Sequence, residues 1–501
     1  MRKPTILLHL AVSSCALVCF AVAYEGKTVF SEDLRVLMMA GAALALLWIP
    51  VAAQYKLGLR DPYSPIALQA LGYTFLFVVS GAYLTLRPEA NLVANYFGYA
   101  NYFDKALAVM LIGWAATVSG MYASMAKRMG ASWRTVSWQG ASPTTMVSVS
   151  LVLLAIGWGA QLTLLFEGVY FHSFGSEFRW STENSVVEQV RMLRYIGFAM
   201  LAYGGLSNQK KINAATWTFL IAVVVVELIF SVGSGKRIDA MMFLFICSCI
   251  YVDIWRPRIT WRKSVLIVSL AIVAFLFLGV QDVYRNSLLR TAMKQGGTVQ
   301  LEDMWTSFAG SFDESLSDEG LLRTADISMS RTGEIVSLAA LVSPTGEDDE
   351  LQYGSTFLPS LVNSVFVLVP RTLLPVKPDV NSPYNVFDKK YFPGYGGSLP
   401  ITYVGEAYYN FGLLGVVGVM FVFGVAQGAF YNYCRRRSRY NLGLRVAYVM
   451  VAINFAWVSS NMAPQITYVL RILVYVWLIG IVLSWRGPGK LEIDSKPKMY
   501  L

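Results

Sequence analysis

Basic side chains recur in the short polar segments that flank strongly apolar stretches of this sequence. Planar guanidinium groups bind phosphate oxygens through paired hydrogen bonds, and the contact strengthens where water is partly excluded. Arginines that converge at the outer surface of a membrane would therefore suit a lipid-linked pyrophosphate. The basic residues in such segments are Lys236, Arg237, Arg285, Arg323, Arg331, Arg371 and Lys377.

The turn GSGKR, which ends in Lys236 and Arg237, has the glycines and lysine of a nucleotide-binding loop. That motif requires a glycine five residues before its Gly-Lys pair and Ser or Thr directly after the lysine. Phe230 stands at the first of these positions and Arg237 at the last. The sequence therefore argues against a nucleotide site.

Each basic residue also has a structural alternative, because it could cap a helix or pair with an acid such as Asp239, Asp282 or Glu334. Two ionisable residues inside apolar stretches carry the same ambiguity. Such groups are costly in a membrane and usually face a partner or a cavity. Arg471 is a candidate phosphate ligand, and Glu227 is either its counterion or structural.

The segment GGSLPITYVGEAYYNFGLLG, residues 396–415, places a carboxyl group near the outer end of an apolar stretch. Desolvation raises a carboxyl pKa, which suits Glu406 to general-base chemistry, and an ion pair with an arginine is the alternative. Tyr403 and Tyr408 fit the aromatic belt of a membrane interface. Stacking on a sugar ring is the functional alternative for both, and for Tyr395.

Metal-dependent chemistry has no support in the sequence. The chain has two histidines, and no group of His, Cys or carboxylate residues has the spacing of metal ligands. We therefore expect neither a metal site nor another cofactor.

The apolar stretches define the fold class. The chain has 501 residues, of which 55% are hydrophobic and 14% charged, whereas soluble domains carry about a quarter charged residues. Runs of about 18 or more apolar residues predict about twelve membrane-spanning helices, and hence an all-α polytopic membrane protein. The predicted spans begin near Ile6, Leu34, Ile66, Ala106, Met146, Met192, Ala215, Ile238, Ser264, Tyr408, Leu444 and Ile466.

The net charge of +10 reflects topology rather than binding to nucleic acid. The excess of Lys and Arg falls in alternate short loops, among them residues 127–134, 256–263 and 435–445. By the positive-inside rule these loops and both termini are cytoplasmic. The first span resembles a signal peptide, and its retention or cleavage leaves the rest of the map unchanged.

This topology divides the chain into four parts. Residues 1–280 hold spans one to nine, residues 281–405 form a large outer loop with amphipathic or re-entrant helices, residues 406–485 hold spans ten to twelve, and residues 486–501 form a cytoplasmic tail. Within the loop, residues 302–320 and 323–343 are expected to form surface helices. Long ordered loops usually carry function.

Several motifs resemble the bacterial O-antigen, or oligosaccharide repeat-unit, polymerases of the Wzy type. They are GSGKR, YRNS at residues 284–287, and VPRTLLPVKP followed by the segment at 396–415, and the resemblance covers roughly residues 220–430. It implies a GT-C-like, inverting, metal-independent glycosyltransferase in the bacterial cytoplasmic (inner) membrane. The enzyme would transfer a glycan from undecaprenyl pyrophosphate to an incoming lipid-linked repeat unit, in O-antigen, capsule or exopolysaccharide synthesis.

On this resemblance, Arg237, Arg285 and Arg371 would neutralise the pyrophosphate leaving group. Glu406 would orient or deprotonate the acceptor hydroxyl. The expected partners are undecaprenyl-pyrophosphate-linked oligosaccharides, membrane lipid, and a chain-length regulator and a flippase of the same pathway, with no nucleic acid.

Two alternatives from the sequence remain open. O-antigen ligases share a large outer loop, but they typically place a histidine there, and none occurs in residues 281–406. A multi-span transporter or lipid-linked glycan flippase predicts repeats and broken helices at the midplane, and neither is visible in the sequence.

Overall fold

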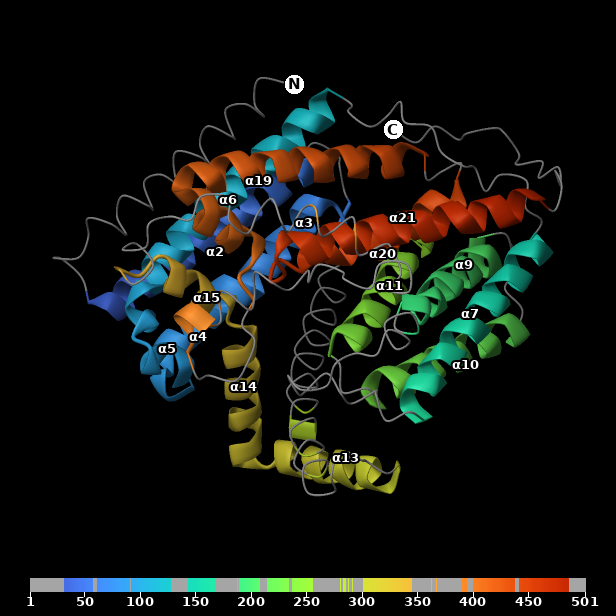
Figure 1. Cartoon of the computed structure of the whole chain (residues 1–501), viewed down its shortest axis with the longest axis horizontal. Helices are drawn as coiled ribbons and strands as arrows, with labels where there is room; N and C mark the ends of the chain where they lie inside the picture. The colour runs from blue at the N-terminus through green and yellow to red at the C-terminus, as the bar shows by residue number, and fades with distance from the viewer. Residues whose placement is uncertain are drawn as a thin grey trace.

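The computed structural model of the chain consists of helices joined by turns and loops, with no strand among the residues that it describes (Figure 1). These residues are 31–56, 61–127, 143–166, 187–207, 214–233, 237–255, 301–344, 387–393, 400–437 and 441–485, with short gaps in some ranges and a few isolated positions elsewhere.

Four groups of helices follow one another along the chain. The first contains α2 (Glu32–Lys56), α3 (Pro65–Tyr73), the π-helical segment η2 (Thr74–Val79), α4 (Ser80–Leu86), η3 (Pro88–Ala90), α5 (Leu92–Tyr96), η4 (Tyr99–Tyr102) and α6 (Phe103–Ala126). The second contains α7 (Pro143–Phe166), α9 (Leu193–Ser207), α10 (Ala214–Gly233) and α11 (Arg237–Trp255). The predicted outer loop contributes α13 (Leu301–Leu316), α14 (Asp318–Thr332) and α15 (Glu334–Leu341). The last contains α19 (Tyr403–Arg437), α20 (Leu442–Ala456) and α21 (Met462–Trp485).

The described helices agree with the predicted fold class. Segments long and apolar enough to cross a membrane are Asp33–Lys56, Pro65–Leu86, Tyr99–Ala126, Thr144–Leu164, Tyr403–Cys434 and Met462–Leu483, with shorter apolar helices at Trp217–Phe230, Met241–Ile254 and Leu442–Ala456. Helices cover the predicted span starts that fall within the described residues, except that α9 begins one residue after Met192, while the starts near Ile6 and Ser264 fall outside them. The total of about twelve spans stays a prediction.

Close helix contacts build a first hydrophobic core, in which α19 packs along α6. A Cβ at Gly120 of α6 would overlap the carbonyl oxygen of Phe421, and one at Gly424 of α19 would overlap that of Thr117. Small residues at such crossings let membrane helices approach closely. A second core joins α7 and α9 to α11, α20 and α21.

The outer-loop helices divide into an exposed part and a buried part. The surface helix predicted for residues 323–343 is broken at Gly333, whose φ of −75° and ψ of 69° are not helical. Before the break, α14 projects away from α4 towards α13 (Figure 1). After it, α15 packs against η2, α4, η4, α6 and α19, and all of its residues are buried. The prediction of a surface helix is therefore wrong for residues 334–341, because their mostly apolar sequence EIVSLAAL is buried against the first bundle.

Polar contacts attach α14 to the end of α4. The hydroxyl of Tyr83 donates a hydrogen bond to Asp326 at 2.6 Å, and Arg87 forms an ion pair with the same carboxylate at 3.4 Å. These contacts hold the middle of α14 against the end of α4.

Candidate functional site

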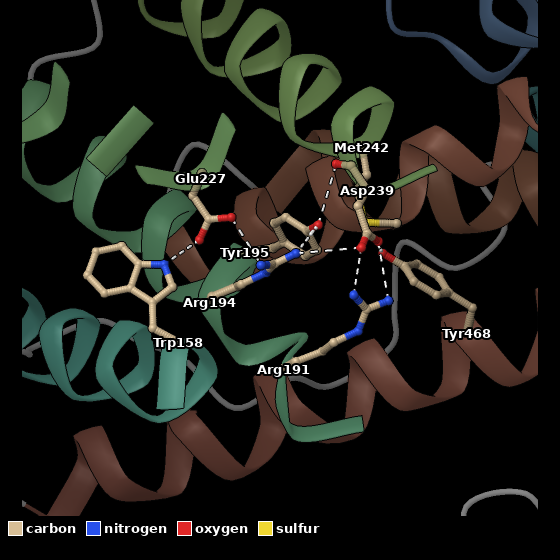
Figure 2. Close-up of polar contacts among 8 residues, drawn as sticks. All are labelled: Trp158, Arg191, Arg194, Tyr195, Glu227, Asp239, Met242 and Tyr468. Atoms are coloured by element: carbon tan, nitrogen blue, oxygen red, sulfur yellow. Dashed lines mark hydrogen bonds and ion pairs between the residues drawn. The ribbon is translucent and has the colours of Figure 1, made fainter. Parts of the chain in front are cut away.

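A group of charged side chains lies buried where α9, α10 and α11 meet (Figure 2). We call Arg191, Arg194, Glu227 and Asp239 the arginine cluster, and none of the four is more than 5% exposed. Arg191 lies two residues before the start of α9, Arg194 lies in the first turn of α9, and Asp239 lies in the first turn of α11. The charge-based topology assigns these helix ends to the outer side of the membrane.

Asp239 holds both arginines of the cluster. Its Oδ2 accepts a hydrogen bond from Nη1 of Arg191 at 2.6 Å, and its Oδ1 accepts one from Nη2 at 3.3 Å. Nη2 of Arg194 lies 3.8 Å from the same Oδ2. The two-point contact fixes the plane of the Arg191 guanidinium, and the N-terminus of α11 favours the negative charge of Asp239.

Glu227 on α10 balances Arg194. The Nε of Arg194 lies 3.5 Å from Oε2 of Glu227, and the indole of Trp158 donates a hydrogen bond to Oε1 at 2.7 Å. Both charged residues have no exposed surface. The sequence leaves open whether Glu227 faces Arg471 or is structural, and its observed partners belong to α7 and α9 instead.

Two tyrosines border the cluster. The hydroxyl of Tyr195 accepts a hydrogen bond from Nη2 of Arg194 at 2.7 Å and donates one to the carbonyl oxygen of Asp239 at 3.4 Å. On α21, the hydroxyl of Tyr468 donates to the sulfur of Met242 at 3.5 Å (Figure 2). These contacts connect α9, α11 and α21 around the charged groups.

A third arginine lies near the cluster on α21. Because α21 begins at Met462, one turn earlier than predicted, Arg471 lies about two and a half turns into the helix instead of one and a half. Arg471 is within electrostatic range of Tyr468 and Tyr475. The hydroxyl of Tyr475 in turn donates to the carbonyl oxygen of Gln189, just before Arg191, at 3.2 Å.

A glycine on α7 allows the helices to bring this cluster together. A Cβ at Gly157 would lie 2.5 Å from the backbone nitrogen of Arg194 and 2.6 Å from its Cβ. The close approach of α7 to α9 also brings the next residue, Trp158, within hydrogen-bond distance of Glu227. A larger residue at Gly157 would separate the two helices.

The cluster holds guanidinium groups in fixed orientations, buried from solvent. Arg191 and Arg194 pair with the carboxylates of Glu227 and Asp239, and Arg471 adds a further positive charge near Tyr468 and Tyr475. A carboxylate and a phosphate group both offer oxygen pairs to a guanidinium fork. The arrangement therefore has the chemistry of an oxyanion site whose arginines are held in place by carboxylates.

Most of the residues predicted to bind pyrophosphate lie outside the described side chains. Arg237 opens α11 two positions before Asp239, and Arg331 lies in α14, but the structure describes neither side chain. Predicted residues wholly outside the described part are Lys236, Arg285, Arg371, Lys377 and Tyr395. The convergence of these residues stays a prediction. Arg237 is the first residue of α11, and the arginine cluster lies at that same end of the helix.

Glu406 lies in the first turn of α19 and has no exposed surface. Its Oε2 accepts a hydrogen bond from the backbone N–H of Met462 at 2.8 Å. Met462 is the first residue of α21, so the carboxylate satisfies one of the unpaired N–H groups that every helix start has. This contact gives Glu406 a structural role as a helix cap, while the base and ion-pair roles predicted from the sequence stay predictions.

The predicted sugar-binding tyrosines on α19 differ in exposure. Tyr403 has no exposed surface, and its ring packs against those of Tyr73 and Phe423, with centroids 6.4 and 5.2 Å away. Tyr408 is half-buried at the edge of the first core. The enclosure of Tyr403 favours a packing role over a contact with sugar.

Arg191 and Arg194 are absent from the predicted set of basic residues. Their sequence RMLR nevertheless carries a signal, since arginines three positions apart share a helix face. At the outer end of a predicted span the positive-inside rule leads us to expect few such residues. The RMLR pattern can be recognised in the sequence. The carboxylates that pair with its arginines, Glu227 and Asp239, come from later helices and cannot be identified from the sequence alone.

One protein-family model matches most of the chain. The family is described as O-antigen polysaccharide polymerase Wzy, and the match covers residues 63–487, which include the arginine cluster, α15 and α19. The search of curated proteins and the search of solved structures each found no match. The predicted resemblance to repeat-unit polymerases is confirmed, and with it a multi-pass membrane protein that acts on lipid-linked oligosaccharide repeat units. The chain belongs to the O-antigen polysaccharide polymerase Wzy family.

Proposed function

We propose that this protein is a membrane glycosyltransferase that polymerises undecaprenyl-pyrophosphate-linked oligosaccharide repeat units on the outer face of the cytoplasmic membrane. The growing glycan is transferred as a block to the non-reducing end of an incoming lipid-linked unit. The anomeric carbon inverts, and undecaprenyl pyrophosphate leaves. The product belongs to O-antigen, capsule or exopolysaccharide synthesis.

The observation that carries this proposal is the buried arginine pair beside the first turn of α11. Arg191 and Arg194 are oriented by Asp239 and Glu227, and Arg471 adds positive charge nearby. A diphosphate leaving group develops negative charge as the glycosidic bond breaks, and fixed cations that meet this charge lower the barrier. Such a site requires no nucleotide, because the activated bond is already present in the lipid-linked donor.

The basic residues predicted from the sequence extend this site. In the proposal, Arg237, Arg285 and Arg371 bind the diphosphate directly. Lys236, Arg331, Lys377 and Arg471 complete its binding, and Tyr395 and Tyr408 contact the glycan. The start of α11 at Arg237, two residues before Asp239, supports one member of this set.

The cellular arrangement in the proposal follows the charge distribution of the sequence. The protein lies in the bacterial inner membrane with both termini in the cytoplasm. Its loop at residues 281–405 is the outer functional subdomain, and a chain-length regulator and a flippase of the same pathway are its partners. The burial of α15 against the first bundle supports a loop that is integrated with the membrane helices.

The test is a deletion strain complemented with the wild-type protein or with Arg371→Ala, read as a glycan ladder on a gel. Loss of one cationic ligand should raise the barrier by about 2.7–4 kcal/mol, a rate loss of about 10²–10³. A polymerase defect leaves single repeat units capped on the final acceptor lipid. A ligase defect leaves long polymer on the carrier lipid instead.

Arg323→Ala is the matched control, because Arg323 is an exposed residue of the same loop and pairs with Glu314 at 2.8 Å. It should leave the ladder unchanged. An unchanged ladder in Arg371→Ala would remove Arg371 from the mechanism, and failure of the wild-type protein to restore polymer would contradict the proposed function.

A further inference from the structure

Glu334 is the first residue of α15 and lies between the bundle helices. Next to it, a Cβ at Gly333 would lie 3.0 Å from Leu84, and the side chain of Ile335 fits against Gly81. Glu334 is 6% exposed, whereas Ile335 and Leu338 of the same helix are 0% exposed. Glu334 is thus buried, but it is the most exposed residue of α15.

Within the described part of the chain, no hydrogen bond or ion pair reaches the Glu334 carboxylate. The sequence analysis names Glu334 as a possible ion-pair partner of an outer basic residue. No arginine whose side chain is described forms an ion pair with it. Ser337, one turn along the same face, has a buried hydroxyl that also lacks a hydrogen-bond partner among the described residues. Two unsatisfied polar groups on one helix face are unusual, since buried polar groups are almost always hydrogen-bonded.

Burial raises the pKa of the Glu334 carboxyl well above its usual range. The titratable groups on the elements packed against α15 include Tyr83 on α4, Tyr99 and Tyr102 on η4, Asp104, Lys105 and Tyr122 on α6, and Tyr403, Glu406, Tyr408, Tyr409, Tyr431, Tyr433 and Cys434 on α19. Asp104 forms an ion pair with Arg35 at 3.6 Å. None of these groups is a partner of Glu334, so burial alone accounts for the shift.

We infer that the first turn of α15 is the acceptor subsite, in which Glu334 binds the attacking sugar hydroxyl and takes up its proton. The inference rests on the proposed function and supplies its missing base. Glu406, the base predicted from the sequence, is engaged at the start of α21. Glu334 offers a carboxylate that no described group occupies, in a helix of the outer loop.

The step balances without a metal or a nucleotide. The acceptor oxygen forms a bond to the anomeric carbon of the donor, and the bond from that carbon to the diphosphate breaks with its electron pair on the diphosphate. The hydroxyl proton passes to the carboxylate of Glu334 and then to solvent. The arginines and the base thus act on opposite ends of the same displacement.

The experiment uses the full-length protein in a deletion strain and in membranes supplied with lipid-linked repeat units. Variants are Glu334→Gln, Glu334→Asp and the control Glu302→Gln, an exposed residue of α13. The Glu334→Gln protein should accumulate in the membrane to the same amount as wild type, because an amide is no harder to bury than an unpaired carboxyl group. Its polymerisation rate should fall about 10²–10⁴-fold. Glu334→Asp should keep part of the activity that Glu334→Gln loses, and the control Glu302→Gln should polymerise at the wild-type rate.

The pH profile separates a base from a structural residue. Because the ionised carboxylate is the base, wild-type activity should rise as pH passes upward through the raised pKa of Glu334, and this dependence should vanish in Glu334→Gln. A Glu334→Gln variant that polymerises like wild type overturns this inference but not the proposed function. A Glu334→Gln variant that fails to accumulate in the membrane also overturns this inference only. A wild-type protein that makes no polymer overturns the proposed function as well.

Discussion

The arginine cluster and the first turn of α15 are both buried, yet their charges are satisfied in opposite ways. Every charged member of the cluster has an oppositely charged group within 3.8 Å. Glu334 has no partner within the described part of the chain. A mutually paired cluster can hold helices together without any ligand, whereas a carboxyl group without a partner among the described residues is available to bind another group.

The comparison teaches that burial of charge does not by itself identify a reacting group. Carboxylates hold both arginines of the cluster, and Arg194 also donates to the hydroxyl of Tyr195, so the first effect of these contacts is to orient the guanidinium groups. Residues 403–411 of α19 contact both α15 and the start of α21. Gly405 approaches Leu341 of α15, and Glu406 caps α21.

Asp239→Asn should have the largest effect on stability. The amide removes one of the two carboxylates that the described residues place against the buried Arg191 and Arg194. Breaking a buried ion pair in this way costs about 3–5 kcal/mol. The melting temperature of the protein in detergent measures the loss. Asp313→Asn, on the exposed side of α13, is the control, and a melting temperature equal to wild type in Asp239→Asn would show that the cluster does not stabilise the fold.

Gly412→Ala tests the break in α19 that follows residues 403–411. Gly412 breaks α19 with φ of 61° and ψ of −156°, a conformation that is essentially restricted to glycine, and nothing lies within 4 Å of an added Cβ. The loss of about 1–3 kcal/mol should therefore come from backbone strain alone. Gly418→Ala is matched to it, since that position is helical and equally open. Equal stability of the two variants would contradict a required break.

Variants of Glu406 distinguish a helix cap from a catalytic base. Glu406→Gln keeps a side-chain oxygen for the N–H of Met462, so stability and polymerisation should both stay near wild type. Glu406→Ala should lose about 0.5–2 kcal/mol, the usual cost of losing a cap. Thermal melts and ladder gels measure the two effects together. A stable Glu406→Gln protein without polymer would restore Glu406 as the catalytic carboxylate.

The smallest expected effect is a pH dependence of stability. Burial raises the pKa of Glu334 in the folded protein above its unfolded value, so the folded state binds this proton more tightly. The stability from that proton is fully present below the unfolded pKa and is lost as pH rises through the folded pKa. The melting temperature of Glu334→Gln should therefore gain on wild type as pH increases. A constant difference at all pH values would show that Glu334 has an ordinary pKa.

The sequence predicts the fold better than the site, for physical reasons. Long apolar runs identify membrane helices without knowledge of their neighbours. In contrast, the contact from Glu406 to Met462 joins residues 56 positions apart, and the ion pair from Arg191 to Asp239 joins residues 48 apart. Such pairings depend on helix packing, which a local pattern does not contain.

The burial of α15 is a second feature that a local sequence pattern does not predict. The break at Gly333 is visible as a glycine between a polar and an apolar segment, but the sequence does not say which surface the apolar part will meet. Glu334 is predictable only as a carboxyl group near arginines. Its lack of a partner emerges once α4, η4, α6 and α19 surround the helix.

The initial rates of polymer formation by Glu334→Gln and Glu406→Gln, measured side by side in membranes with equal amounts of protein, test the comparison most directly. If the unsatisfied carboxylate is the base and the hydrogen-bonded one is a cap, Glu334→Gln should be slower than wild type by about 10²–10⁴-fold and Glu406→Gln should match wild type. The reverse order would contradict the assignment of the acceptor subsite to α15.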